Sequence, residues 1–137
     1  MTLSSADLKT IGEVAIRHWP DLWAVYLFGS AVAADGLRSD SDIDVAILGL
    51  VKPRAESILA MKAELSQHFR RDIDIVDLRR ADTVTSAQVI STGLTLVDNR
   101  PFDVAQFETT VYSQYALLNE ERAGILADIV ARGRIYG

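Results

Sequence analysis

The spacing of hydrophobic residues divides the first part of the chain into a helix followed by two strands. Apolar side chains recur at helical spacing after Ser4 or Ser5, either of which can cap a helix, and Pro20 ends that pattern. Two compact apolar runs of strand length follow, at residues 22–28 and 42–48. Acidic residues alternate with apolar ones at the start of the second run, which predicts a strand with one end in water.

The middle of the chain predicts two more helices around a third strand. Pro53 opens the first of these helices, in which the inward-facing apolar positions fall three or four residues apart. Residues 73–78 form another apolar run of strand length. Asp82 or Thr83 then caps a short helix that ends at Gly93.

The last third of the chain predicts one short strand and a long helical region. The strand covers residues 94–97, and apolar side chains recur at helical spacing from Asp103 onward. Gly124 and the polar stretch at residues 119–122 interrupt this spacing, so one long helix and two shorter helices both fit. The alternation of strands and helices favours a single α/β or α+β domain.

The composition narrows the class of protein. The chain has 137 residues, of which 49% are hydrophobic, and its formal net charge is −5. This length suits one domain with its own core, and the lack of cysteine excludes disulfides, thiolate metal sites and thiol catalysis. No apolar run approaches the ~20 residues of a membrane span, and the negative balance disfavours direct binding to nucleic acid. We therefore expect a soluble cytoplasmic protein that binds neither membranes nor nucleic acid.

Some side chains have a structural interpretation that competes with a functional one. The arginine pairs at residues 70–71 and 79–80 are expected at solvated ends of elements, and the alternative is that they contact an acidic nucleotide or partner. Apolar residues of the C-terminal helical region either close the core or form a stripe that faces a partner, and the pattern favours neither. Four aromatic residues are expected to pack in the core and on the sheet rather than to stack on a base: Trp19, Trp23, Tyr26 and Phe28.

A Gly-Ser dipeptide follows the first predicted strand and precedes a run of small residues that can begin a helical turn. Gly29 lets the backbone approach a ligand without a Cβ in the way. The amides at the start of such a turn, together with the Ser30 hydroxyl, would cradle a phosphate. Gly-Ser is also ordinary turn chemistry, so the dipeptide alone is a weak signal.

Two aspartates stand two residues apart at the start of the second predicted strand. Asp42 and Asp44 therefore project from the same face, where two crowded carboxylates repel each other unless a cation lies between them. All-oxygen ligation suits Mg²⁺ or Mn²⁺, whereas a solvated strand end is the alternative interpretation. Asp40 extends the series toward the loop and is interpreted as a solvated turn residue.

A third aspartate lies in the apolar run at residues 73–78. Asp74 would present a further carboxylate beside the pair, because a charge among apolar neighbours needs a partner. Asp72 and Asp77 are interpreted as solvated residues at the ends of the strand. Three carboxylates beside a phosphate cradle suit nucleotidyl transfer, in which divalent metals hold the triphosphate.

These residues resemble the signature of the minimal nucleotidyltransferases of the DNA polymerase β superfamily. The pattern is Gly29-Ser30, eleven residues, then Asp42-Ile43-Asp44, preceded by Ser41, with a third acid on a later strand at Asp74. The resemblance covers essentially the whole chain. It implies a polymerase-β-like α/β (α+β) fold with a short mixed sheet flanked by helices and a helical C-terminal tail.

Within that superfamily, a chain of this size resembles the MNT-type antitoxins that are encoded beside HEPN-domain RNase toxins. The resemblance implies an antitoxin of a type VII-like HEPN/MNT toxin–antitoxin system that transfers AMP from ATP to tyrosine of its HEPN toxin. It also implies a single domain over residues 1–137, with a catalytic core at 1–100 and a helical tail at 101–137 as a candidate partner-binding segment. A homo-oligomer or hetero-oligomer would be compatible with this family.

The same resemblance implies a role for each motif residue. Gly29 and Ser30 would hold the phosphates of ATP, and Asp42, Asp44 and Asp74 would bind two Mg²⁺ ions. Asp74 would also be the catalytic base. Two other functions stay open on the sequence: an antitoxin that neutralises its toxin by binding alone, and a nucleotidyltransferase that modifies a small molecule such as an antibiotic.

Overall fold

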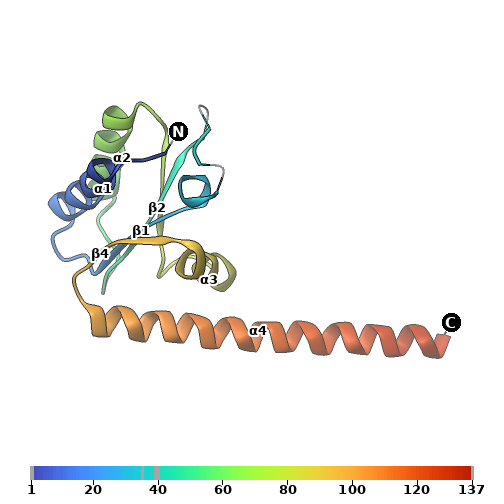
Figure 1. Ribbon diagram of the computed structural model, residues 1–137. Coiled ribbons are helices and arrows are strands. Elements are labelled where there is room, and N and C mark those ends of the chain that lie inside the picture. Colours follow the sequence, from blue (N-terminus) through green and yellow to red (C-terminus); the bar gives the residue numbers. More distant parts are fainter. Residues whose placement is uncertain (1, 35, 39–40, 137) are drawn as a thin grey trace.

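The computed structural model describes residues 2–34, 36–38 and 41–136, with side chains as far as residue 131. The described elements alternate between helices and strands, as the sequence predicts (Figure 1). In chain order they are α1 (Ser5–His18), β1 (Ala24–Phe28), the 3₁₀ turn η1 (Gly29–Val32), β2 (Ile43–Leu48), α2 (Ala55–Phe69), β3 (Ile73–Asp77), α3 (Thr83–Thr92), β4 (Leu94–Asp98) and α4 (Pro101–Tyr136).

Side-chain caps fix the starts of two helices where the sequence predicts them. The Ser4 hydroxyl accepts a hydrogen bond from the amide of Asp7, and the Asp7 carboxylate accepts one from the amide of Ser4. This reciprocal pair satisfies two amides that the first turn of α1 leaves without helical partners. Asp82 caps α3 through its carboxylate, which accepts a hydrogen bond from the amide of Thr85 at 2.7 Å.

The four strands form one mixed sheet in the order β3-β2-β1-β4. Strand β1 lies antiparallel to both β2 and β4, whereas β2 and β3 are parallel. The parallel pair needs a crossover, and α2 supplies it. This architecture confirms the predicted mixed sheet flanked by helices.

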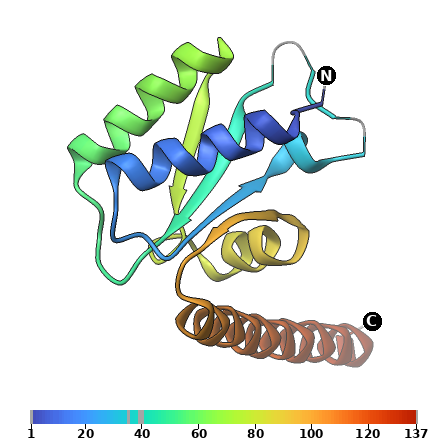
Figure 2. The ribbon, with the colours of Figure 1, turned by 60° about the vertical axis from the view of Figure 1, so that its left-hand side comes forward.

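Helices cover both faces of the sheet (Figure 2). Alternate strand residues point toward α1 and α2, where they form the larger core with residues such as Ile11 and Met61. The residues between them point toward α3 and α4, where Tyr26, Ala46 and Leu48 pack with Val89 and Val104. Each strand therefore contributes to two separate cores through its twofold side-chain alternation.

The aromatic residues at the start of the sheet pack as the sequence predicts. Trp19, Trp23 and Tyr26 are buried, and Phe28 packs against the core on the side of α3 and α4. Arg79 stays exposed, as expected for the end of an element, but its guanidinium lies 4.9 Å from the ring centroid of Trp23. This cation–π contact closes the edge of that core.

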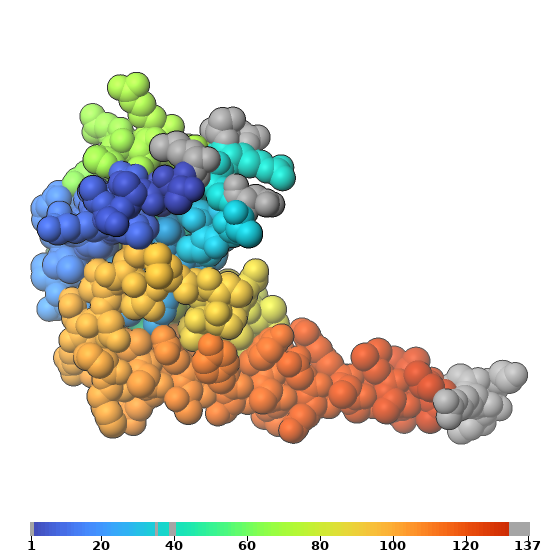
Figure 3. Space-filling view, in the orientation of Figure 1, coloured from blue at the N-terminus to red at the C-terminus, as the bar shows by residue number. Residues whose placement is uncertain are grey.

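The C-terminal region is one continuous helix, which resolves the choice between one helix and two. Gly124 stands in the helix with open space around it, and nothing at that position forces a break. The first half of α4 packs on α3, and its second half projects beyond the domain (Figure 3). The described residues contain no helix with the length and apolar character that crossing a membrane requires.

Candidate functional site

The Gly-Ser dipeptide lies directly after β1 and begins the turn η1. Gly29 has a φ of +71°, a left-handed conformation that favours glycine. A Cβ at this position would overlap Oδ2 of Asp44, so the glycine lets the carboxylate lie directly against the turn. The phosphate cradle and the acidic strand that the sequence predicts are therefore adjacent in space.

The register of the sheet places two of the predicted acids side by side. Asp44 of β2 pairs with Phe28 of β1 on one side and with Asp74 of β3 on the other. Burial raises the pKa of the Asp44 carboxyl, and the charges of Asp74 and Asp42 raise it further. We call Asp42, Asp44 and Asp74 the carboxylate cluster.

Two details of this cluster differ from the sequence predictions. Asp42 is exposed and lies one residue before β2, so the strand begins later than predicted. Asp74 is also exposed, and the argument that its charge needs a partner because it is enclosed by apolar neighbours is wrong. Its apolar neighbours Ile73 and Ile75 pack on the opposite face of the sheet. The parallel register, rather than burial, brings Asp74 to Asp44.

Arg71 contributes to the site, although its position in the sequence predicts a solvated end of an element. Its Nη1 group donates to the carbonyl oxygens of Arg38 and Ser41, at 3.0 Å for Ser41. These bonds tie the segment before Asp42 to the start of β3. A fork of donors can hold two carbonyls at once, so Arg71 positions the approach to the carboxylate cluster. Asp40 lies outside the described residues.

The carboxylate cluster has the chemistry of a divalent cation site. All its donors are oxygens, and the charges of Asp74 and Asp42, in addition to burial, raise the pKa of the Asp44 carboxyl, a repulsion that a bound cation would relieve. In the described part of the chain, no three histidine, cysteine or acidic side chains converge closely enough to hold a metal ion as they stand. Carboxylate oxygens are the donors that Mg²⁺ prefers, so the chemistry of the donor set fits this ion.

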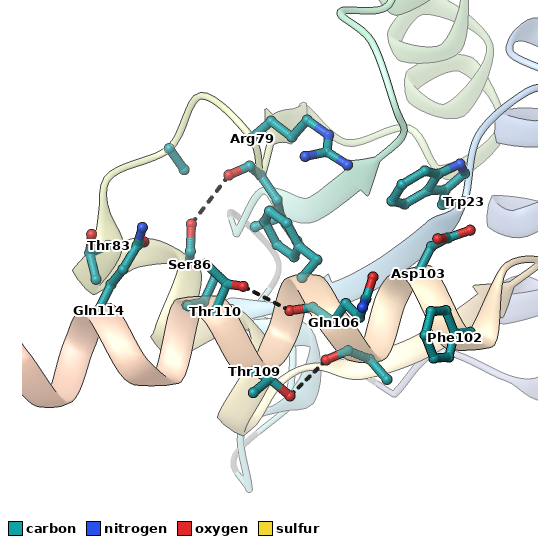
Figure 4. Close-up of a pocket in the computed structure, with 15 residues that line it drawn as sticks. Trp23, Arg79, Thr83, Ser86, Phe102, Asp103, Gln106, Thr109, Thr110 and Gln114 are labelled. Atoms are coloured by element: carbon teal, nitrogen blue, oxygen red, sulfur yellow. Dashed lines mark hydrogen bonds between the residues drawn. The ribbon is translucent and has the colours of Figure 1, made fainter.

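A separate groove of about 880 Å³ lies between α3 and the first half of α4 (Figure 4). Hydroxyl groups along it bond to main-chain carbonyls: Ser86 donates to Leu78, and Thr110 donates to Gln106. Its described lining includes neither the Gly-Ser turn nor a member of the carboxylate cluster. The groove is therefore distinct from the candidate site.

Comparison with known families agrees with this geometry. Residues 9–102 match the family described as "Polymerase beta, Nucleotidyltransferase", a range that contains the Gly-Ser turn and all three acids. The chain belongs to this nucleotidyltransferase family. The matched range includes the turn after β1, the start of β2 and the start of β3, which lie together at one end of the sheet.

Individual members of the nucleotidyltransferase family are similar over most of the chain. The protein adenylyltransferase MntA of Shewanella oneidensis is 34% identical over 112 residues, which cover 82% of this chain and 79% of MntA. A solved complex of the tri-AMPylated Shewanella oneidensis HEPN toxin with MNT antitoxin matches with 29% identity and a TM-score of 0.72, covering 93% of this chain and 99% of the matched chain. A toxin–antitoxin structure with AMP-PNP matches with 31% identity and a TM-score of 0.72, covering 89% and 98%.

Proposed function

We propose that this protein is the antitoxin of a HEPN toxin and neutralises it by transferring AMP from ATP to a toxin tyrosine. The observation that carries the proposal is the placement of Asp44, which lies against the Gly29 turn and beside Asp74 in the parallel register. The similarity to a protein adenylyltransferase and to complexes that contain a HEPN toxin and AMP-PNP supports the same activity. AMP-PNP is an analogue of ATP, which supports ATP as the nucleotide.

Each residue of the site has a role in this reaction. Gly29 and Ser30 orient the triphosphate so that the tyrosine oxygen attacks the α-phosphorus in line with the departing pyrophosphate. Asp42, Asp44 and Asp74 would hold two Mg²⁺ ions, which neutralise the charge that develops on the phosphates. Asp74 accepts the proton of the attacking hydroxyl, and its exposed position leaves it accessible to a protein substrate.

The double substitution Asp42→Asn with Asp44→Asn tests this proposal. It removes two negative ligands and keeps their shape, so we expect AMP transfer to fall at least ~100-fold because metal-assisted charge stabilisation supplies several kcal/mol. The measurement is the intact mass of the proposed HEPN partner after incubation with ATP, Mg²⁺ and each variant. Additions of AMP mass are expected with the unaltered protein.

A matched control is the double substitution Asp21→Asn with Glu56→Gln, which removes two exposed acids far from the cluster in sequence. We expect this control to transfer AMP like the unaltered protein. Undiminished labelling by the Asp42/Asp44 variant would contradict the catalytic proposal. Full neutralisation of the toxin by that variant without any mass gain would indicate an antitoxin that acts by binding alone.

A further inference from the structure

Helix α4 extends past the end of the sheet that carries the candidate site. It starts beyond Asp98, which pairs with Ala24 at the beginning of β1, whereas Gly29 follows the last residue of β1. The 36 residues of α4 span about 54 Å, but the five residues of β1 span only about 17 Å. Figure 1 shows the helix leaving the domain on the side where η1 lies.

The projecting part of α4 exposes apolar side chains to water. From residue 119 to residue 131 every side chain is exposed, including Ile125 at 60%, Leu126 at 62%, Ile129 at 57% and Val130 at 53%. At 100° per residue, these side chains and the alanines between them cover roughly half the circumference of the helix. A helical segment this short has little stability of its own in water, so a face this broad calls for a partner.

The apolar face continues the seam by which α4 packs on its own domain. Val104 and Val111 are buried against the domain, and Leu118 and Ile125 follow at the same spacing of seven residues. Positions seven apart lie nearly in line on a helix. The exposed face is therefore directed to the side of α4 on which the domain lies, into the angle between the domain and the projecting helix (Figure 3).

We propose that the apolar face of α4 between residues 118 and 130 forms a docking arm that binds a helix of the HEPN toxin and holds that protein beside the carboxylate cluster. This inference rests on the proposed function, because the arm lies at the end of the sheet where AMP transfer would occur. The packed part of α4 ends near residue 118, about 86% of the chain, whereas the match to the HEPN-toxin complex covers 93%. The relative in that complex therefore shares part of the arm.

The side chains of the arm specify the chemistry of the bound helix. Arg122 lies within the apolar face, and the acids Glu120, Glu121 and Asp128 lie on the rest of the circumference. The toxin helix must therefore offer an apolar ridge with an acidic group opposite Arg122. A partner held in this way experiences a high effective concentration at the site, so the arm acts on the KM for the protein substrate rather than on kcat or on the KM for ATP.

The double substitution Ile125→Glu with Ile129→Glu tests the arm in the full chain. Burial of two isoleucines at an interface contributes enough that we expect the KM for the HEPN protein to rise about 100-fold, with an unchanged KM for ATP. The control is Leu117→Glu with Ala131→Glu, which places two charges on the same helix outside the apolar face and should leave both KM values unchanged. Circular dichroism verifies that both variants remain folded.

The outcomes separate this inference from the proposed function. An unchanged KM for the HEPN protein in the Ile125/Ile129 variant would overturn the docking arm while AMP transfer itself still stood. If the unaltered protein transferred no AMP, the proposed function would fail, and calorimetric titration of the HEPN protein into each variant would decide the arm alone. A dimer of the unaltered chain that dissociates in the Ile125/Ile129 variant would assign the arm to a second copy and overturn the proposal.

Discussion

The two faces of the sheet are built from the same strands, but their side chains differ in polarity along each strand. On the face covered by α1 and α2, β2 presents Ile43, Val45 and Ile47, each at most 1% exposed. On the face covered by α3 and α4, the same strand presents Ala46 and Leu48, both buried, and the half-buried Asp44 as its second residue. Along β2, the first face is apolar throughout, whereas the second changes from buried apolar residues to the acidic residue of the candidate site.

This difference shows how a small domain separates stability from function. Strand alternation assigns neighbouring residues to opposite faces, so an acidic site can begin one residue away from a complete core. The separation depends on register, because a slip of one residue would exchange the two sets of side chains. Substitutions on the first face should therefore change the free energy of unfolding, and those at the site should change activity.

The largest expected effect tests the apolar face. Ile47→Ala removes a fully buried side chain from the core under α1 and α2, and we expect a loss of about 2–5 kcal/mol in the free energy of unfolding. Urea denaturation measures this loss. Asp44→Asn, three residues away on the other face, should leave stability unchanged or raise it, because it removes a charge that its neighbours repel. Equal losses in both variants would break the comparison.

A second prediction concerns the close contact between the turn and the acid. Gly29→Ala places a Cβ on Asp44 at a positive φ, and backbone strain of this kind costs about 1–3 kcal/mol. We expect AMP transfer to fall roughly 10- to 100-fold because Asp44 must move. Gly124→Ala is the control, since its Cβ enters open space in a helix and should leave transfer unchanged. Transfer rates under saturating ATP distinguish the two variants.

A third prediction concerns the buried phenol that joins the second face to α4. Tyr26 donates to Oε1 of Glu108 at 2.7 Å, and Tyr26→Phe should lower the free energy of unfolding by about 1–2 kcal/mol. Burial, followed by the Glu108 carboxylate, raises the pKa of Tyr26 well above its usual range. The folded protein therefore holds this proton after the unfolded chain loses it, and stability should fall as the pH rises above about 10.

Tyr115→Phe is the control for this experiment, because Tyr115 stands on the same helix outside the buried core. Tyr115→Phe should change the free energy of unfolding at neutral pH little, whereas Tyr26→Phe should lower it and should also flatten its decrease above about pH 10. An unaltered alkaline limb in the Tyr26 variant would show that the phenol does not link α4 to the sheet.

The smallest expected effect lies outside the first face, between α1 and α2. Glu64 accepts hydrogen bonds from Arg17 Nη1 at 2.6 Å and from His18 Nε2 at 2.9 Å, and these partners lower the pKa of its carboxyl. The stability it contributes is present above the ordinary pKa of 4.5 and is lost as the pH falls through the lowered value. Glu64→Gln should reduce the pH dependence of the free energy of unfolding below pH 4.5 only slightly, because the ion pair of Glu64 with Arg17 is exposed.

Local patterns in the sequence predict most of the fold and part of the site. The helix spacings, the caps at Ser4 and Asp82 and the apolar runs depend on residues close together in the chain, and each predicted element is present. Asp44 beside the Gly29 turn could also be expected from the motif that both residues share. These features need only short-range physics and a known signature.

Contacts between distant segments could not be predicted in the same way. The family signature predicts Asp74 as the third acid, but neither its burial nor its neighbours indicate the parallel pairing across α2 that brings it to Asp44. Arg71 positions the approach to Asp42 through main-chain carbonyls, which carry no sequence signal. The continuity of α4 through Gly124 depends on the absence of any competing contact around that residue.

A helix that leaves its domain has a separate folding equilibrium. Its outer turns lack the tertiary contacts that protect amide hydrogens, so they open without unfolding the sheet. Exchange of the amides in residues 117–131 should therefore be fast in the isolated protein, while β1 and β2 exchange only with global unfolding. In this chain, residues 117–131 therefore stay helical only when a partner is bound. A protease should cleave this segment in the free protein and not in the complex.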